Sequence, residues 1–203
     1  MADSGADRGQ TVRRRIGLYG GSFDPIHLGH VILAVEAVEA GRLDELVLIP
    51  ARQSPLKSKM PEIAGEHRLA MAELAVAPFE HLSVWAGEVY KPEPSYTFDT
   101  VAAWQSEHPE AKLFWIIGAD QAHDLPRWHR IEDLATRVTF LVTGREDTSP
   151  EPAEPVSGLR LERIATRRID VSSTEIRERQ HAGRAFRHLM PGPVADYLLE
   201  HGL

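Results

Sequence analysis

Two histidines stand three positions apart in the segment GGSFDPIHLGH, residues 20–30, with a glycine between them. The apolar run before this segment predicts a buried strand, so His27 and His30 stand where the following helix should begin. The first turn of a helix offers unpaired N–H groups and the positive end of the helix dipole, and both attract anions. The paired glycines let the main chain approach a ligand, Gly29 keeps side-chain bulk away, and two imidazoles can donate to one anion. This arrangement indicates a phosphate site.

An HxxH pair has two other interpretations. It can be an ordinary helix start with solvated or core histidines, or half of a zinc site. No HExxH motif and no cysteine is available to complete a zinc site, so we expect no metal bound by the protein. The segment also lacks GxGxxG, and the chain contains no GKS or GKT. These absences exclude the dinucleotide fingerprint and the Walker loop, so any phosphate must be held in another way.

A second helix start with polar groups appears near the other end of the chain, in VSSTEIR, residues 171–177. Ser172, Ser173 and Thr174 offer hydroxyl and N–H groups to phosphate oxygens. Arg177 lies one turn further on and can present a fork of donors to the same anion. Taken alone, the segment is equally an ordinary N-cap followed by an exposed arginine.

The elements that must position these segments alternate between strand and helix patterns. Helical spacing of apolar residues separates the strands, and a last amphipathic helix is expected within PGPVADYLLEHGL, residues 191–203. This alternation predicts an α/β fold, a Rossmann-like doubly wound parallel sheet with a short C-terminal helical section. Short runs rich in β-branched and aromatic residues predict strands at 15–20, 45–50, 82–87, 112–118, 138–144 and 159–165.

Length and composition describe a globular chain of ordinary balance. With 203 residues, 42% of them hydrophobic, we expect a mobile tail over residues 1–13 and a single domain over 14–203. The proline-rich and acidic stretch 146–156 should form a surface loop. No apolar run reaches the roughly 20 residues of a membrane helix, and the first residues lack the apolar middle of a secretory signal. Together with the absence of cysteine, this predicts a cytoplasmic protein.

The net charge restricts the partners. The chain carries 23 basic and 30 acidic residues, a net charge of -7, so its surface should repel nucleic acid and anionic membranes. The only basic run near the N-terminus, residues 13–15, is interpreted as a solvated tail that leads into a strand. We therefore expect no nucleic-acid and no membrane partner. An anionic ligand must be held by a local cluster of donors.

The motifs occur in the order of a known family. GGSFDPIHLGH resembles the HxGH signature of the nucleotidyltransferase superfamily and, in detail, the bacterial nicotinate mononucleotide adenylyltransferases; VSSTEIR resembles their ISSTxxR signature. The resemblance runs from about residue 15 to the end of the chain. SPLKSK departs from the commoner PPHK form but retains Lys57, and Ser22 stands where threonine is frequent. The other matching pieces are ARQSPLKSK at 51–59, HRLAM at 67–71, PSYTFDT at 94–100, WIIGAD at 115–120 and LPRWH at 125–129.

The resemblance implies transfer of AMP from ATP to nicotinate mononucleotide, which gives deamido-NAD and pyrophosphate in NAD biosynthesis. The 5'-phosphate is already a charged nucleophile, so in-line attack without a covalent enzyme intermediate needs positioning and charge stabilisation rather than a strong base. Mg2+ is expected to arrive with ATP. The resemblance assigns catalysis to His27, His30 and Arg177, and ATP or phosphate binding to Gly20, Gly21, Ser22, Phe23, Gly29, Lys57, Ser172, Ser173 and Thr174.

We expect a different set of residues to bind the mononucleotide. Trp128 can stack on the pyridine ring, and Asp120, just past a predicted strand, can accept ribose hydroxyls. Trp115 is expected in the core, and Asp24 is expected to fix the turn around the following proline rather than to bind metal. The N–H groups of a strand–helix junction can meet a carboxylate, which assigns Ser95, Tyr96 and Thr97 to the same subsite.

Other functions stay open at this point. A member of the superfamily can prefer nicotinamide mononucleotide, or transfer a nucleotidyl group to another phosphate such as phosphopantetheine. A non-catalytic nucleotide sensor could keep the fold without the chemistry. An RNA-binding protein that uses the basic run 13–15 is disfavoured by the net charge. The oligomeric state cannot be read from the residues.

Overall fold

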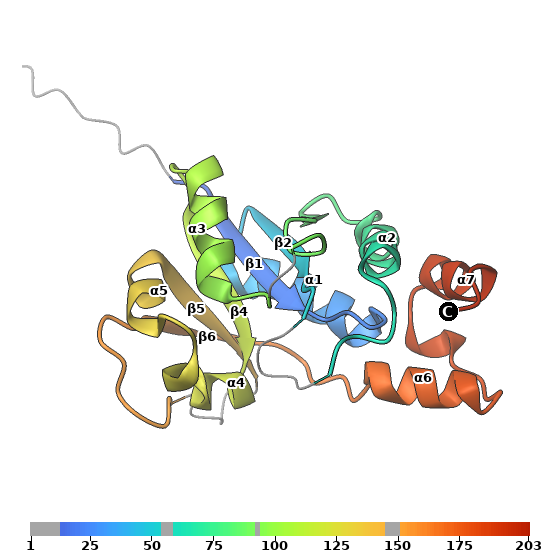
Figure 1. The fold of residues 1–203 in the computed structure, drawn as a ribbon. Coiled ribbons are helices and arrows are strands. Elements are labelled where there is room, and N and C mark those ends of the chain that lie inside the picture. Colours follow the sequence, from blue (N-terminus) through green and yellow to red (C-terminus); the bar gives the residue numbers. More distant parts are fainter. Residues whose placement is uncertain (1–12, 54–58, 92–93, 145–150) are drawn as a thin grey trace, which may run out of the picture.

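A computed structural model describes residues 13–53, 59–91, 94–144 and 151–203. Its centre is a sheet of six strands in the order β3-β2-β1-β4-β5-β6, and every neighbouring pair is parallel (Figure 1). Parallel strands that are covered on both faces read as continuous apolar runs. The predicted α/β class and the parallel sheet are therefore confirmed. The strands are β1 (Arg15–Gly21), β2 (Glu45–Pro50), β3 (Leu82–Val84), β4 (Lys112–Gly118), β5 (Val138–Gly144) and β6 (Leu161–Ala165).

Helices cover both faces of the sheet, as a doubly wound fold requires. In Figure 1, α3 and α5 lie at one side of the view and the C-terminal helices α6 and α7 at the other. Two short 3-10 helices follow α4 and α6. The helices are α1 (Leu28–Gly41), α2 (Gly65–Val76), α3 (Thr97–Glu107), α4 (Ala119–His123), η1 (Leu125–Arg127), α5 (Ile131–Arg137), α6 (Ser173–His181), η2 (Arg187–Leu189) and α7 (Gly192–Glu200).

Alternate residues of the strands enter two separate hydrophobic cores. Along β4, Phe114 and Ile116 join the core under α1, α2, α6 and α7, whereas Leu113, Trp115 and Ile117 join the core under α3, α4 and α5. This is the two-residue period of a strand that is buried on both faces. Trp115 is 5% exposed, which confirms its expected place in the core.

The strand order reverses at β1, which pairs with β2 on one side and with β4 on the other. Open parallel sheets bind ligands beyond the carboxyl ends of the strands at this point of reversal. Gly20 and Gly21 end β1, Pro50 ends β2 and Gly118 ends β4. The predicted phosphate segment 20–30 therefore lies where the topology opens a crevice.

The predicted elements differ from the observed ones in three strands and two helices. Strand β1, expected over 15–20, ends one residue later, at Gly21. The strand expected over 82–87 ends at Val84, because Trp85 makes one more bond to Leu48 O and the chain then turns, with Val89 N donating to Ala86 O. The strand expected over 159–165 starts only at Leu161. Helices α4 and α5 were not predicted.

The C-terminal section is helical, as expected. Helix α7 lies beside α2 and buries Val194 and Leu198, which confirms the amphipathic spacing. Of the expected surface loop, residues 151–156 are described and form no helix or strand, while 146–150 lie outside the described residues. The tail 1–12 lies outside them too, so the division into a tail and one domain stays a prediction. No described helix is long and apolar enough to cross a membrane.

Candidate active site

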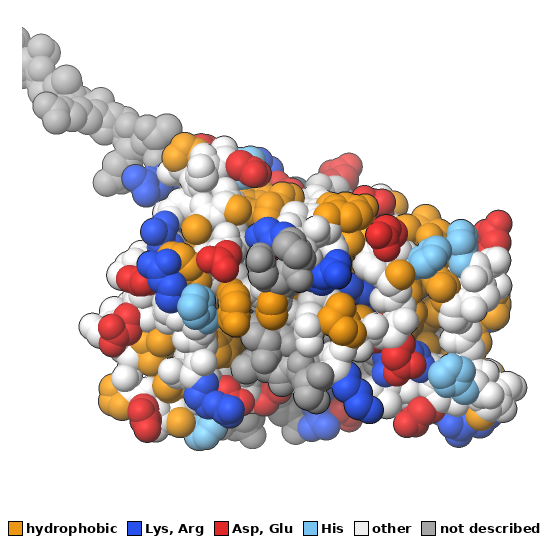
Figure 2. Space-filling view, viewed as in Figure 1, with side chains coloured by type: hydrophobic (Ala, Val, Ile, Leu, Met, Phe, Trp, Pro, Cys, Tyr) orange, Lys and Arg blue, Asp and Glu red, His pale blue; other side chains and the backbone are white. Residues whose placement is uncertain are grey.

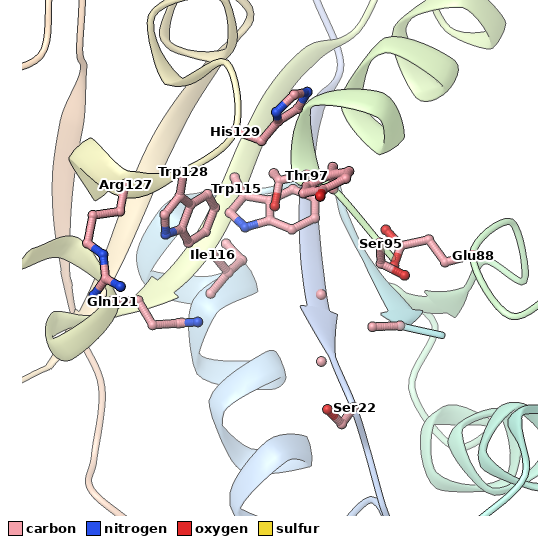
Figure 3. Close-up of a pocket in the computed structure, with 14 residues that line it drawn as sticks. Ser22, Glu88, Ser95, Thr97, Trp115, Ile116, Gln121, Arg127, Trp128 and His129 are labelled. Atoms are coloured by element: carbon pink, nitrogen blue, oxygen red, sulfur yellow. The ribbon is translucent and has the colours of Figure 1, made fainter. Parts of the chain in front are cut away.

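A cavity of about 530 Å3 opens beyond the carboxyl ends of β1, β2 and β4. Figure 3 shows Glu88 and Ser95 on one side of it and Gln121 and Arg127 on the opposite side, with the rings of Trp115 and Trp128 between them. The wall combines residues within β1 and β4 with residues of the segments that follow β1 and β2 or precede α3 and α5. The wall consists of Gly20, Gly21, Ser22, Ala51, Glu88, Ser95, Tyr96, Thr97, Trp115, Ile116, Gln121, Arg127, Trp128 and His129.

The absence of a side chain at Gly20 lets the Trp115 ring reach the strand end. A Cβ at Gly20 would stand 2.8 Å from Trp115 Cζ2. A Cβ at Gly21 would stand 2.7 Å from Phe23 Cε1. Both distances are too short for carbon atoms in contact. The paired glycines are therefore required by two aromatic rings of this chain, in addition to any approach of a ligand.

The two histidines form one stacked unit at the start of α1. Their ring centroids are 3.7 Å apart with an interplanar angle of 25°, and the Phe23 ring meets His30 edge-on at 5.0 Å. The His27 main-chain N–H donates to His30 Nδ1 at 3.3 Å. An accepting Nδ1 carries no proton, so His30 holds its proton on Nε2, as a neutral donor.

His27 is the more deeply buried of the pair. Burial lowers its pKa from 6.5 to about 4, so its ring is neutral at pH 7. Its Nδ1 is buried and has no hydrogen-bond partner within the described structure. Two charged imidazoles at this separation would repel each other. The stacked geometry favours neutral donors.

The start of α6 meets the turn between β1 and α1. Ser173 Oγ donates to Pro25 O at 2.9 Å, and Arg177 Nη1 donates to Asp24 O at 2.5 Å. Ser172 caps α6, because its Oγ accepts from the N–H of Glu175. A Cβ at Gly29 would lie 3.1 Å from the His27 ring and 3.7 Å from Ile169 O. The two predicted phosphate segments are therefore neighbours, although the residues in contact lie 148 and 153 positions apart in the chain.

Asp24 fixes this junction. Its carboxylate accepts from the N–H groups of Glu62 at 3.0 Å and Ile63 at 2.9 Å, and Arg177 Nη1 lies 3.4 Å from Oδ2. The expected role in fixing the turn therefore extends to a second segment, residues 62–63. The peptide bond between Asp24 and Pro25 is cis.

Arg68, on α2, forms hydrogen bonds with three main-chain segments next to the turn between β1 and α1. Its side chain is buried, and its guanidinium donates to Ser22 O at 2.6 Å, Ala51 O at 2.7 Å and Ile63 O at 3.0 Å. Burial lowers the pKa of this guanidinium, and the charge of Asp24 acts in the opposite direction. One cation thus joins the ends of β1 and β2 to the segment before α2.

Glu88 is a buried carboxyl in the cavity wall. Thr100 Oγ1 donates to its Oε1, and the Ser95 side chain also forms a hydrogen bond with it. Burial raises the pKa of the Glu88 carboxyl, while these hydrogen bonds act in the opposite direction. Ser95 Oγ additionally accepts from Arg52 N at 3.0 Å, so this hydroxyl is used within the protein.

The predicted site residues divide into two neighbouring groups. Ser95, Tyr96, Thr97 and Trp128 line the cavity together with Gly20, Gly21 and Ser22. Asp120 is exposed in the first turn of α4 and is not part of the cavity wall. Lys57 lies outside the described residues. Around the turn beside the cavity, and not on its wall, are Phe23, His27, Gly29, His30, Ser173 and Arg177, with Ser172 and Thr174 at the start of α6.

Several residues of the site were missed by sequence reasoning. Gln121 directly follows the WIIGAD piece, and Arg127 and His129 lie within the LPRWH piece, so these two matches could have indicated all three. His129 lies against Tyr96, with ring centroids 4.5 Å apart. No local pattern distinguishes the buried Glu88 and Arg68 from exposed charges, because their burial depends on distant segments.

On the face drawn in Figure 2, basic and acidic side chains are interspersed. Among the described residues no group of three or more His, Asp or Glu side chains could hold a metal ion.

Comparisons with known proteins place the chain in a family. A sequence model of the family described as cytidylyltransferase-like matches residues 18–179. Two similar curated proteins are each named probable nicotinate-nucleotide adenylyltransferase. That of Methylacidiphilum infernorum is 39% identical over 96% of this chain and 94% of its own length, and that of Gemmatimonas aurantiaca is 40% identical over 93% and 92%.

Solved structures show the same fold. The Plasmodium falciparum nicotinic acid mononucleotide adenylyltransferase complexed with NaAD superposes with a TM-score of 0.70 at 18% identity, covering 94% of this chain and 97% of that one. The complex of the same enzyme with APC gives a TM-score of 0.67 over 94% and 96%. At this identity the likeness concerns the fold alone. The family match and the curated relatives establish that the chain belongs to the cytidylyltransferase-like family, among the nicotinate-nucleotide adenylyltransferases.

Proposed function

We propose that this protein is a nicotinate-nucleotide adenylyltransferase, an enzyme that transfers AMP from ATP to nicotinate mononucleotide in NAD biosynthesis. The observation that carries the proposal is the junction of the two helix starts, where the stacked histidines and the Ser173–Arg177 segment meet at one turn beside an aromatic cavity. The relatives named for this activity support it. A cytoplasmic location stays a prediction from the sequence.

In the proposed reaction, a 5'-phosphate oxygen of the mononucleotide attacks the α-phosphorus of ATP. One P–O bond forms, the bond to the bridging oxygen of the β-phosphate breaks, and pyrophosphate leaves with that electron pair. Neutral His30 donates from Nε2 to a phosphate oxygen that gains charge, with His27 beside it. Arg177 and the N–H groups at the start of α6 bind the leaving phosphates. Gly29 keeps the first turn of α1 open to the triphosphate.

The cavity would hold the nicotinate mononucleotide. Trp128 offers an aromatic face to the pyridine ring, with the edge of the buried Trp115 ring in the wall beside it. The N–H of Thr97 at the start of α3 can donate to the pyridine carboxylate, whereas the N–H of Tyr96 already donates to Pro94 O. The Ser95 hydroxyl serves this subsite indirectly, through Glu88. Lys57 and Asp120 keep their proposed contacts with phosphate and ribose.

We also propose that Mg2+ enters with ATP and is held by phosphate oxygens and water. Asp24 lies in the turn between β1 and α1, residues 22–27, which we call the histidine turn. It already accepts two main-chain N–H groups and faces Arg177, so its carboxylate has other partners. When bound, Mg2+ would neutralise part of the triphosphate charge.

A comparison of kcat/KM for nicotinate and nicotinamide mononucleotides, with ATP and Mg2+, tests the substrate. We expect the nicotinate form to be preferred, with pyrophosphate released only when the mononucleotide is present. A preference for the amide would overturn the substrate assignment, and binding of both substrates without turnover would indicate a sensor.

The same assay tests His30. We expect His30→Ala to lower turnover by at least about 100-fold, the usual loss for one donor to a developing charge. His181→Ala, an exposed histidine at the end of α6, is the control and should leave turnover unchanged. Near-normal turnover of His30→Ala would remove His30 from the mechanism.

A further inference from the structure

Arg177 is held by two acidic residues at its place beside the histidine turn. Its Nη1 donates to the main-chain oxygen of Asp24 at 2.5 Å, and its Nε lies 2.9 Å from Oε1 of Glu62. The Arg177 side chain is only 18% exposed, whereas the Glu62 side chain is 58% exposed. The guanidinium is therefore largely enclosed, and its acidic neighbour Glu62 borders solvent.

The contact with Glu62 is close but poorly directed. Arg177 Nε is buried and has no hydrogen-bond partner, although Glu62 Oε1 is within 2.9 Å, because the oxygen lies off the direction of the N–H bond. A buried N–H without an acceptor is unfavourable. The arginine therefore keeps an unsatisfied donor that an oxygen from another anion could reach in line.

We infer that the Glu62 carboxylate competes with ATP for Arg177. It occupies the phosphate-binding edge of the guanidinium until ATP displaces it, and it thereby weakens the affinity for ATP. This inference rests on the proposed function, because it takes the triphosphate as the ligand of Arg177. The triphosphate carries more negative charge than a single carboxylate, and one of its oxygens can approach the N–H in line. Glu62 leaves easily, since its side chain already borders solvent.

The main chain at Glu62 does not depend on its carboxylate. The Glu62 N–H donates to Asp24 Oδ2 at 3.0 Å, and the next N–H donates to Oδ1 at 2.9 Å. Replacement of the side chain therefore keeps this segment attached to the histidine turn. Glu62→Gln removes one negative charge next to Arg177 and leaves the shape of the side chain nearly unchanged.

The test is the dissociation constant for ATP, measured by calorimetry without mononucleotide, together with the KM and kcat of the full reaction. We expect Glu62→Gln to tighten ATP binding by about two- to fivefold, the size of an exposed ion pair, and to lower the KM for ATP without lowering kcat. The KM for the mononucleotide should not change. The gain in affinity should shrink at high ionic strength.

Two further variants make the test specific. Glu178→Gln removes the same charge from an exposed residue of α6 next to Arg177 in sequence, and should leave ATP affinity unchanged. In an Arg177→Ala background, Glu62→Gln should no longer tighten binding, because the competition has been removed.

Unchanged or weaker ATP binding in Glu62→Gln would overturn the inference, and so would an equal gain in Glu178→Gln or in the Arg177→Ala background. Each of these results leaves the proposed function intact as long as the wild-type enzyme turns over. A wild-type protein that neither binds ATP nor turns over would refute the proposed function itself.

Discussion

Replacement of Arg68 by methionine should destabilise the fold and damage the site together. The buried guanidinium donates to three main-chain oxygens, those of Ser22, Ala51 and Ile63, at distances of 2.6, 2.7 and 3.0 Å. A hydrogen bond from a charged donor contributes about 1.5 kcal/mol at the low end of its range. Relief of the guanidinium from burial offsets part of the loss. We expect a net destabilisation of about 3 to 4 kcal/mol.

Urea unfolding followed by circular dichroism measures this change, and for a chain of this length it corresponds to a fall in Tm of about 6 to 16 °C. Because Ser22 and Ala51 line the cavity, the KM for the mononucleotide should rise even where the variant is folded. Arg68→Lys keeps the charge but not the fork, so it should recover only part of the stability.

The matched control is Arg14→Met. Arg14 is 60% exposed and pairs with Glu45 at 2.8 Å, an exposed ion pair that contributes at most about 1 kcal/mol. If Arg68→Met and Arg14→Met unfold within 1 kcal/mol of each other, the three oxygens do not depend on the guanidinium, and the reasoning is wrong.

Two other predictions follow from contacts at the site. Gly20→Ala should lower the free energy of unfolding by about 1 to 3 kcal/mol and raise the KM for the mononucleotide, because its Cβ would lie 2.8 Å from Trp115. Gly192→Ala is the control and should cause neither effect, because a Cβ at Gly192 has no atom within 4 Å. Equal behaviour of the two variants would contradict the clash. The pKa of His27 falls from 6.5 to about 4 on folding, so the unfolded chain binds the extra proton between these values. The contribution of neutral His27 to the free energy of unfolding is fully present above pH 6.5. It decreases by up to roughly 3 kcal/mol as the pH falls to 4, because the unfolded chain is then stabilised by protonation. Unfolding measured at several pH values should show a weaker acid dependence in His27→Gln, and an unchanged dependence would show that another group is responsible.

Most of the sheet could be predicted because its strands are buried on both faces. The runs at 45–50, 112–118 and 138–144 match β2, β4 and β5 at both ends. The strand predicted over 82–87 was too long at its C-terminal end. Trp85 is apolar and favours strands, yet the chain turns immediately after it. Helix α5 was missed although Ile131, Leu134 and Ala135 have helical spacing, because the helix has only seven residues.

The candidate site was predictable where its signal is local. The paired glycines and histidines lie within eleven residues and by themselves predict a strand end followed by a helix start. The capping serine before α6 likewise predicts where that helix begins. Contacts between distant segments leave no such pattern. Arg68 follows Glu66 and His67 in the first turn of α2 and looks like an exposed charge, but the ends of β1 and β2 bury it.

The phosphate side of the site exists only when both ends of the chain meet. The polar contacts of α6 with the histidine turn, Ser173 to Pro25 O and Arg177 to Asp24 O, stand beside one fully buried apolar residue of that helix, Ile176. A ligand that contacts both sides of this junction binds the docked state and not the undocked one, so it stabilises docking by an amount that grows with its concentration. In the proposed enzyme, ATP binding and docking of the C-terminal section are therefore linked. Glu62 lies at this junction, because its N–H binds Asp24 while its carboxylate faces Arg177.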